Sequence, residues 1–120
     1  MVMDVNGTPT IVSYEDTLVS AVDRYHSALA AVDVHPRIVL ILTFTGVKGA
    51  ALARSRRYAY DEQLIDRDIL ILPDVLVNEL PTDVPKMLRP VFDAVWNACG
   101  IAGSPDYDES GNWAPGRRGV

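Results

Sequence analysis

The stretch Arg37-Ile-Val-Leu-Ile-Leu-Thr-Phe-Thr45 decides the fold that this sequence predicts. Six of its nine residues are large and apolar, and four of those six are β-branched or aromatic. The stretch lacks polar alternation and is too short to cross a bilayer. Such a run is typical of a strand buried on both faces, so we place residues 37–45 at the centre of a sheet.

A second apolar run, residues 69–77, is predicted to lie beside or near this strand. Its first half is predicted to be a buried strand. Pro73 has no amide hydrogen, so it should break or bulge the pairing of this strand with its neighbour. Residues 8–12 form a further candidate for a short strand near an edge. The pattern of residues 50–60 fits a strand, a helical turn or a loop equally well.

The segment 14–32 is predicted to be an amphipathic helix that begins after Ser13. Apolar residues recur at helical spacing and should form its packed face: Leu18, Ala21, Val22, Tyr25, Ala28, Leu29 and Val32.

A second helix is predicted over residues 83–99. Thr82 or Asp83 can cap its first turn, and Gly100 is a natural stop. Pro90 should either kink this helix or begin a separate one, because proline removes an interior hydrogen bond. Its apolar stripe consists of Val84, Met87, Leu88, Val91, Phe92, Val95 and Trp96.

These elements predict an α/β fold of the α+β type with two layers. We expect a small mixed β-sheet of three to five strands with two main helices packed on it. Residues 1–113 should form a single domain, since Tyr107 and Trp113 are aromatic and expected to fold back onto the body. Residues 114–120 are expected to form a flexible C-terminal tail.

Length and composition exclude several classes of protein. The 120 residues carry a formal net charge of −5, which argues against an extensive nucleic-acid-binding surface. No run is long enough to span a membrane, and Met1-Val2-Met3-Asp4 does not resemble a signal peptide. A lone cysteine, Cys99, permits no disulfide within the chain. We therefore expect a cytoplasmic location.

A basic segment follows the predicted central strand. Gly46 and Gly49 bracket a turn, and the segment after it carries four cationic residues: Lys48, Arg54, Arg56 and Arg57. Glycines let backbone amides approach an anion closely, so these residues are candidates for binding a phosphate or a nucleotide. The turn has neither the Walker spacing nor the dinucleotide Gly-x-Gly-x-x-Gly pattern, and a tight turn with a solvated charged loop is the favoured alternative.

Carboxylates cluster after the basic segment, at Asp61, Glu62, Asp66 and Asp68, with Arg67 among them. Paired carboxylates can hold a metal or act as acid and base, but ion pairing with the nearby arginines is the favoured interpretation.

The remaining reactive side chains do not form a recognisable catalytic set. His26 and His35 are expected to be ordinary surface or boundary histidines, and Cys99 a small buried hydrophobe. We predict no cofactor and no metal, and we favour a role other than catalysis.

The order of several motifs resembles a known family. An amphipathic helix and an apolar strand into the Gly46–Gly49 turn come first, and Ile65-Asp66-Arg67-Asp68 follows. Leu88-Arg89-Pro90, Phe92-Asp-Ala-Val-Trp-Asn97 and Ser104-Pro-Asp-Tyr-Asp-Glu-Ser-Gly-Asn-Trp113 complete the order. Across about residues 14–113 it resembles the C-terminal region of bacterial ATP-binding proteins that carry an N-terminal Schlafen-like AlbA domain.

The resemblance implies an accessory domain in a nucleic-acid- or ATP-linked regulatory protein. The family's ligand-binding function is assigned to the AlbA-like domain, which this chain does not resemble, so no catalytic residue is carried over. The resemblance draws attention to residues with a structural or interaction role: Asp66, Arg67, Asp68, Trp96 and Trp113.

Two functional hypotheses follow. The first is a non-catalytic accessory domain that acts by forming a homodimer or by contacting an AlbA-like domain. The second is an anion- or nucleotide-binding module that uses the basic segment.

Overall fold

The protein folds as an α+β domain, and the computed structural model describes residues 2–5, 8–11, 14–52, 64–80 and 82–115. The predicted fold class is therefore confirmed. The elements follow one another as β1 (Val2–Val5), β2 (Thr8–Ile11), α1 (Tyr14–Ala31), β3 (Ile38–Leu40), β4 (Thr43–Thr45), β5 (Ala51–Leu52), β6 (Ile69–Ile71), β7 (Val75–Val77) and α2 (Val84–Ala98).

The central element of the molecule is a long antiparallel hairpin. Its first arm, residues 37–50, contains β3 and β4, and its second arm, residues 64–77, contains β6 and β7. Strand β3 pairs with β7 and β4 pairs with β6. Beyond them, the amides of Val47 and Gly49 donate to the carbonyls of Asp68 and Ile65. The two apolar runs are thus neighbours, as predicted.

The hairpin is bulged where the second arm contains Pro73. Leu40 pairs with Val75, while the amide of Leu72 donates to the carbonyl of Leu42. One residue of the first arm, Ile41, therefore lies opposite two on the second, Pro73 and Asp74. Proline cannot donate a ladder hydrogen bond, which explains why the extra residue is placed there.

A separate three-stranded sheet closes one end of the molecule. Strand β2 lies between β1, to which it is antiparallel, and β5, to which it is parallel. This is the expected mixed sheet, and Ala51 and Leu52 belong to it as β5. Its middle strand is β2, so residues 37–45 do not lie at the centre of a sheet.

Helix α1 packs with a face that differs slightly from the predicted one. Its buried residues are Tyr14, Glu15, Val19, Val22 and His26. Tyr25 and Val32, which were expected to be packed, are 65% and 69% exposed. His26 is also not a surface residue, since only 6% of it is exposed. The predicted cap residue Ser13 lies outside the described residues.

Helix α2 matches its prediction closely. The side chain of Asp83 accepts a hydrogen bond from the amide of Lys86, which caps the helix. The chain stays helical through Pro90, and Gly100 ends it with a φ of 77° that favours glycine. The residues of its inner face are fully buried: Leu88, Val91, Phe92, Val95, Trp96 and Cys99.

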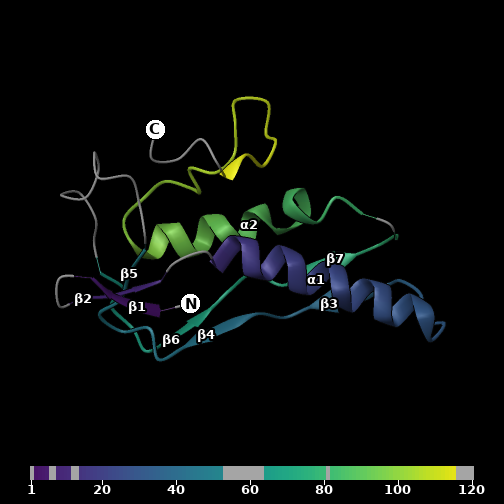
Figure 1. The fold of residues 1–120 in the computed structure, drawn as a ribbon, viewed down its shortest axis with the longest axis horizontal. Coiled ribbons are helices and arrows are strands. Elements are labelled where there is room, and N and C mark those ends of the chain that lie inside the picture. Colours follow the sequence, from purple (N-terminus) through teal and green to yellow (C-terminus); the bar gives the residue numbers. More distant parts are fainter. Residues whose placement is uncertain (1, 6–7, 12–13, 53–63, 81, 116–120) are drawn as a thin grey trace.

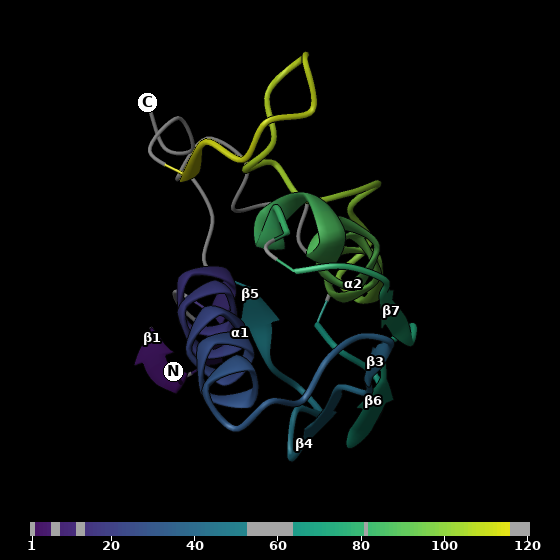
Figure 2. The ribbon, with the colours of Figure 1, turned by 90° about the vertical axis from the view of Figure 1, so that its right-hand side faces the viewer.

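Both helices lie on the same side of the hairpin (Figures 1 and 2). The even-numbered residues of the first arm, Ile38 to Phe44, point toward the helices and are partly buried, while the odd-numbered ones are exposed. The prediction of a strand buried on both faces is therefore wrong. The run is apolar at both odd and even positions, but the described helices cover only one face of the hairpin.

Candidate functional site

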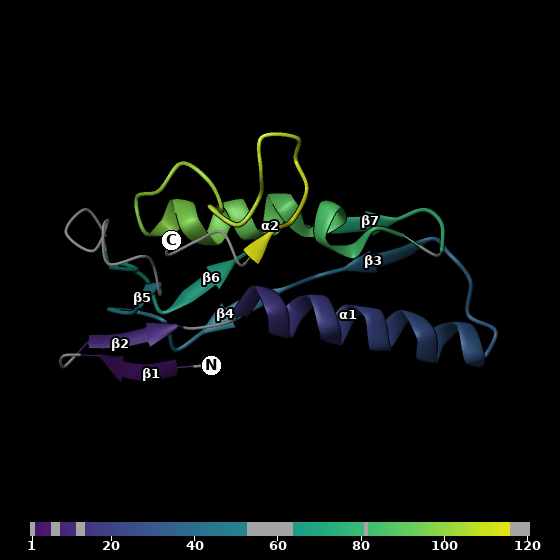
Figure 3. The ribbon, with the colours of Figure 1, turned by 45° about the horizontal axis from the view of Figure 1, so that its top comes forward.

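The uncovered face of the hairpin is apolar, and we call it the outer face. It is formed by five aliphatic side chains that are between 51% and 77% exposed: Val39, Ile41, Ile69, Ile71 and Leu76. Figure 3 shows the hairpin running nearly the length of the molecule beside both helices.

The outer face is continuous across the two arms. Val39 pairs directly with Leu76, Ile71 with Thr43, and Ile69 with Thr45. Residues that pair across a ladder project from the same side of the strands, so these side chains form neighbouring cross-strand pairs. Half-exposed aliphatic side chains are ordinary when scattered, whereas a large contiguous group of them is uncommon on the surface of a monomer.

Charges lie at the rim of the outer face and differ between the arms. The first arm carries two cationic residues, Arg37 and Lys48, and no carboxylate. The second arm carries Asp66, Asp68 and Asp74 with a single cation, Arg67. Arg67 Nε lies 3.2 Å from Asp66 Oδ1, an exposed pair within this arm, whereas the arginines expected to pair with these carboxylates, Arg54, Arg56 and Arg57, lie outside the described residues.

Lys48 is exposed in a turn whose glycines, Gly46 and Gly49, have φ angles of 68° and 81°. The amides of Val47, Gly49 and Ala50 all donate to backbone carbonyls, which leaves few amides for an anion. The other proposed anion-binding residues, Arg54, Arg56 and Arg57, lie outside the described residues. Anion binding by this segment stays a prediction.

A second feature is a buried carboxylate that the sequence did not reveal. Glu15, in the first turn of α1, is only 4% exposed. Its Oε2 accepts hydrogen bonds from Trp96 Nε1 at 2.8 Å and from Ser104 Oγ at 2.7 Å, and its Oε1 accepts one from Trp113 Nε1 at 3.0 Å. The Tyr14 hydroxyl adds a further bond to Oε2 at 3.2 Å.

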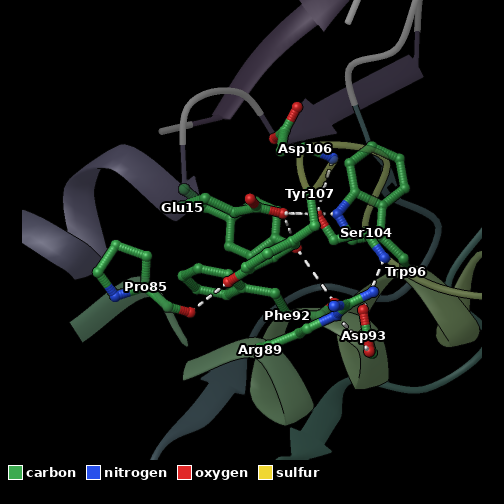
Figure 4. Close-up of polar contacts among 10 residues, drawn as sticks. Glu15, Pro85, Arg89, Phe92, Asp93, Trp96, Ser104, Asp106 and Tyr107 are labelled. Carbon is green, nitrogen blue, oxygen red and sulfur yellow. Dashed lines mark hydrogen bonds and ion pairs between the residues drawn. The ribbon is translucent and has the colours of Figure 1, made fainter. Parts of the chain in front are cut away.

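The Glu15 carboxylate therefore joins three distant parts of the chain (Figure 4). Trp96 and Trp113, predicted as structural or interaction residues, meet at the same acidic side chain. Carboxylate oxygens that are enclosed and saturated by donors are poorly placed to bind a substrate. We interpret this cluster as the attachment of the C-terminal segment, residues 101–115, to the core.

Asp93 and Gly103 strengthen this attachment. The amide of Ser104 donates to Asp93 Oδ1 at 2.8 Å. A Cβ placed on Gly103 would lie 3.0 Å from the same oxygen, so the close approach of this backbone to Asp93 favours glycine.

Tyr107 anchors the middle of the C-terminal segment. Its hydroxyl donates to the carbonyl oxygen of Pro85, and the Arg89 guanidinium lies 4.8 Å from its ring centroid. Burial is the main cause that raises the pKa of the Tyr107 phenol far above its usual range. The charges of Glu15, Asp93 and Asp106 raise this pKa further, and Arg89 partly opposes them.

A groove of about 340 Å³ lies beside α1 and is lined by Asp23, His26, Ser27, Ala30, Leu80 and Thr82. His26 Nε2 has no hydrogen-bond partner in the part of the chain that the structure describes. This nitrogen is itself buried, so a molecule in the groove cannot reach it without a rearrangement. His35 is exposed, as expected, and its Nε2 lies 2.8 Å from Asp33 Oδ1.

Among the described residues, no group of three or more His, Cys, Asp or Glu side chains could hold a metal ion. None of the helices in the described ranges is both long and apolar enough to span a membrane.

Comparisons with known proteins identify no similar protein. No protein-family model matches the chain, and no curated protein or solved structure shows significant similarity to it. The resemblance to the C-terminal region of Schlafen-like AlbA proteins stays a prediction.

Proposed function

We propose that this chain is a protein-interaction domain whose outer face is covered by another protein surface. The observation that carries the proposal is the continuous row of five exposed aliphatic side chains on a hairpin whose other face packs on both helices. The buried carboxylate of Glu15 fits the same proposal, because it accepts hydrogen bonds from Trp96, Ser104 and Trp113 rather than facing an open site.

The energetics favour covering this face. Burying an aliphatic side chain fully stabilises a complex by about 1.5–3 kcal/mol relative to leaving it in water. Half-exposed side chains yield a fraction of that each, and five together offset a substantial part of the entropic cost of association.

Two kinds of partner fit the proposal. One is a second copy of this chain, and the other is a separate domain, for which the sequence resemblance suggests an AlbA-like domain. Both would use the same outer face, so a test of the face itself comes first.

The test measures whether the isolated chain presents an open apolar face. We expect the chain either to associate with itself or, as a monomer, to bind a fluorescent dye that reports exposed apolar surface. The double variant Ile41→Lys/Ile71→Lys should lose both properties and remain folded, because both side chains are more than 70% exposed.

Tyr25→Lys is the matched control, since Tyr25 is 65% exposed but lies on α1, away from the hairpin. It should leave association and dye binding unchanged. A wild-type chain that is monomeric at every concentration and binds no dye would contradict the proposal.

A further inference from the structure

We propose that the partner is a second copy of this chain, packed outer face against outer face about a two-fold axis that runs along the hairpin. This inference rests on the proposed function and specifies its partner. Three features of the outer face support it: its composition, its size, and the distribution of charge around it.

The composition of the outer face suits contact with itself. Its centre is aliphatic, and Thr43 and Thr45 are the exposed polar residues that pair with Ile71 and Ile69. In a two-fold dimer, the same face of the two copies meets across the interface. A face without charged residues at its centre therefore produces no like-charge contact there.

The size of the face is adequate for a small dimer. Five aliphatic side chains at the observed exposures present on the order of 500 Å², which is at the upper end of the largest patches on monomers. With its rim of threonines and charged residues, the face approaches the roughly 800 Å² per partner of a standard interface.

The charge distribution selects the direction of the axis. When two such faces stack, a two-fold axis along the hairpin lays the first arm of one copy over the second arm of the other. Lys48 then lies over the region of the other copy that carries Asp66 and Asp68. A two-fold axis across the hairpin would instead lay first arm over first arm and bring Lys48 near Arg37.

The first arrangement opposes unlike charges and the second opposes like charges. The ion pairs among the described residues do not involve Arg37, Lys48, Asp68 or Asp74. Complementary charge fixes the register of an interface more than it adds to the affinity. We therefore infer that the apolar centre drives association and that the charged arms set the orientation.

Sedimentation equilibrium of the purified chain tests the stoichiometry. We expect a monomer–dimer equilibrium, with Ile41→Lys/Ile71→Lys shifted to monomer and Tyr25→Lys unchanged. Lys48→Glu should weaken the dimer several-fold, because it would place a carboxylate over Asp66 and Asp68. With the axis across the hairpin, the same variant would face Arg37 and strengthen the dimer.

Cross-linking with a short bismaleimide tests the direction of the axis independently. Cys99 is fully buried, so the wild-type chain should not react and serves as the blank. A Thr43→Cys chain, near the middle of the face, should form a covalent dimer in either arrangement. A Val39→Cys chain should do so only when the axis runs along the hairpin, because otherwise the two cysteines lie roughly 20 Å apart along the strands.

The outcomes separate the inference from the proposed function. A dimer that is cross-linked at both Thr43→Cys and Val39→Cys supports the inference. Cross-linking at Thr43→Cys alone, or at Tyr25→Cys instead, overturns it. A chain that stays monomeric but binds the dye would overturn the inference that the partner is a second copy, and would leave the proposed interaction face unchallenged. A monomer that binds no dye would overturn both the inference and the proposed function.

Discussion

Glu15 shows how one side chain can hold a small domain together. Acidic residues in the first turn of a helix are common because they complement the helix dipole, and the sequence gives no reason to treat Glu15 differently. In the structure it is buried and bonded to Trp96, Ser104 and Trp113, which are 81 to 98 positions away. It thereby fixes the C-terminal segment against both helices.

The first prediction concerns Glu15→Gln. The amide of glutamine retains one acceptor oxygen, so buried donors among the two indoles and the Ser104 hydroxyl would lose their acceptor. Leaving a buried donor unsatisfied costs about 1–3 kcal/mol, and we expect the free energy of unfolding to fall by at least that amount. Urea denaturation followed by tryptophan fluorescence measures the loss, since Trp96 and Trp113 both donate to this carboxylate.

Glu79→Gln is the matched control, because Glu79 is exposed on the segment before α2. It should change the free energy of unfolding by no more than about 0.5 kcal/mol. Equal effects of the two substitutions would show that the Glu15 cluster does not anchor the C-terminal segment.

The raised pKa of the Tyr107 phenol predicts that the stability of the fold depends on pH in the alkaline range. The pKa of its phenol is raised in the folded state above the usual value of 10.0, so the folded chain holds the proton more tightly than the unfolded chain. This contribution to stability is complete below about pH 10 and is lost as the pH rises above it.

The variant Tyr107→Phe removes this titrating group. Urea denaturation at a series of pH values gives the free energy of unfolding of the wild type and of the variant. The difference between these two free energies should be constant below about pH 9 and decrease above pH 10. A difference that stays constant through this alkaline range would contradict the expected ionisation.

Helix α2 illustrates what local sequence can predict. Its cap and its terminal glycine are both local signals, and each has the predicted role in the structure. Helix α1 was located correctly, but its packed face is rotated. The choice between alternative apolar stripes depends on where α2 and the hairpin lie, and no local signal contains that information.

Asp83 provides the test of α2 as an element. Its side chain accepts from the amide of Lys86, so Asp83→Ala removes the cap and should lower the free energy of unfolding by about 1 kcal/mol. Glu79→Ala, at an exposed acid on the segment before α2, is the control and should have little effect. Thermal unfolding by circular dichroism distinguishes the two, and equal melting temperatures would contradict the role of the cap.

The hairpin shows where prediction from the sequence stops. The run over residues 37–45 is apolar at both odd and even positions, so periodicity alone cannot distinguish a strand buried on both faces from a strand with one apolar face exposed. The structure resolves this choice: Leu40 and Phe44 pack toward the core, while Val39 and Ile41 are exposed. The Glu15 cluster was equally hidden, because its partners are remote in sequence.

At the scale of the molecule, the outer face lies opposite both helices, and the described elements leave it uncovered. The molecule measures 47 × 32 × 20 Å, so it is a flattened body rather than a sphere. Two such bodies stacked through their outer faces would place the two hairpins between the two pairs of helices. The apolar residues that a single copy exposes would then form the centre of the assembly.

The most direct test of this arrangement is an isotope-filtered nuclear Overhauser experiment on a mixture of labelled and unlabelled chains. We predict contacts between copies that involve the methyl groups of Val39, Ile41, Ile69, Ile71 and Leu76, together with Thr43. Contacts between copies that involve only residues of α1, such as Tyr25, would contradict it. So would the absence of any contact between copies at concentrations far above those that saturate a typical dimer.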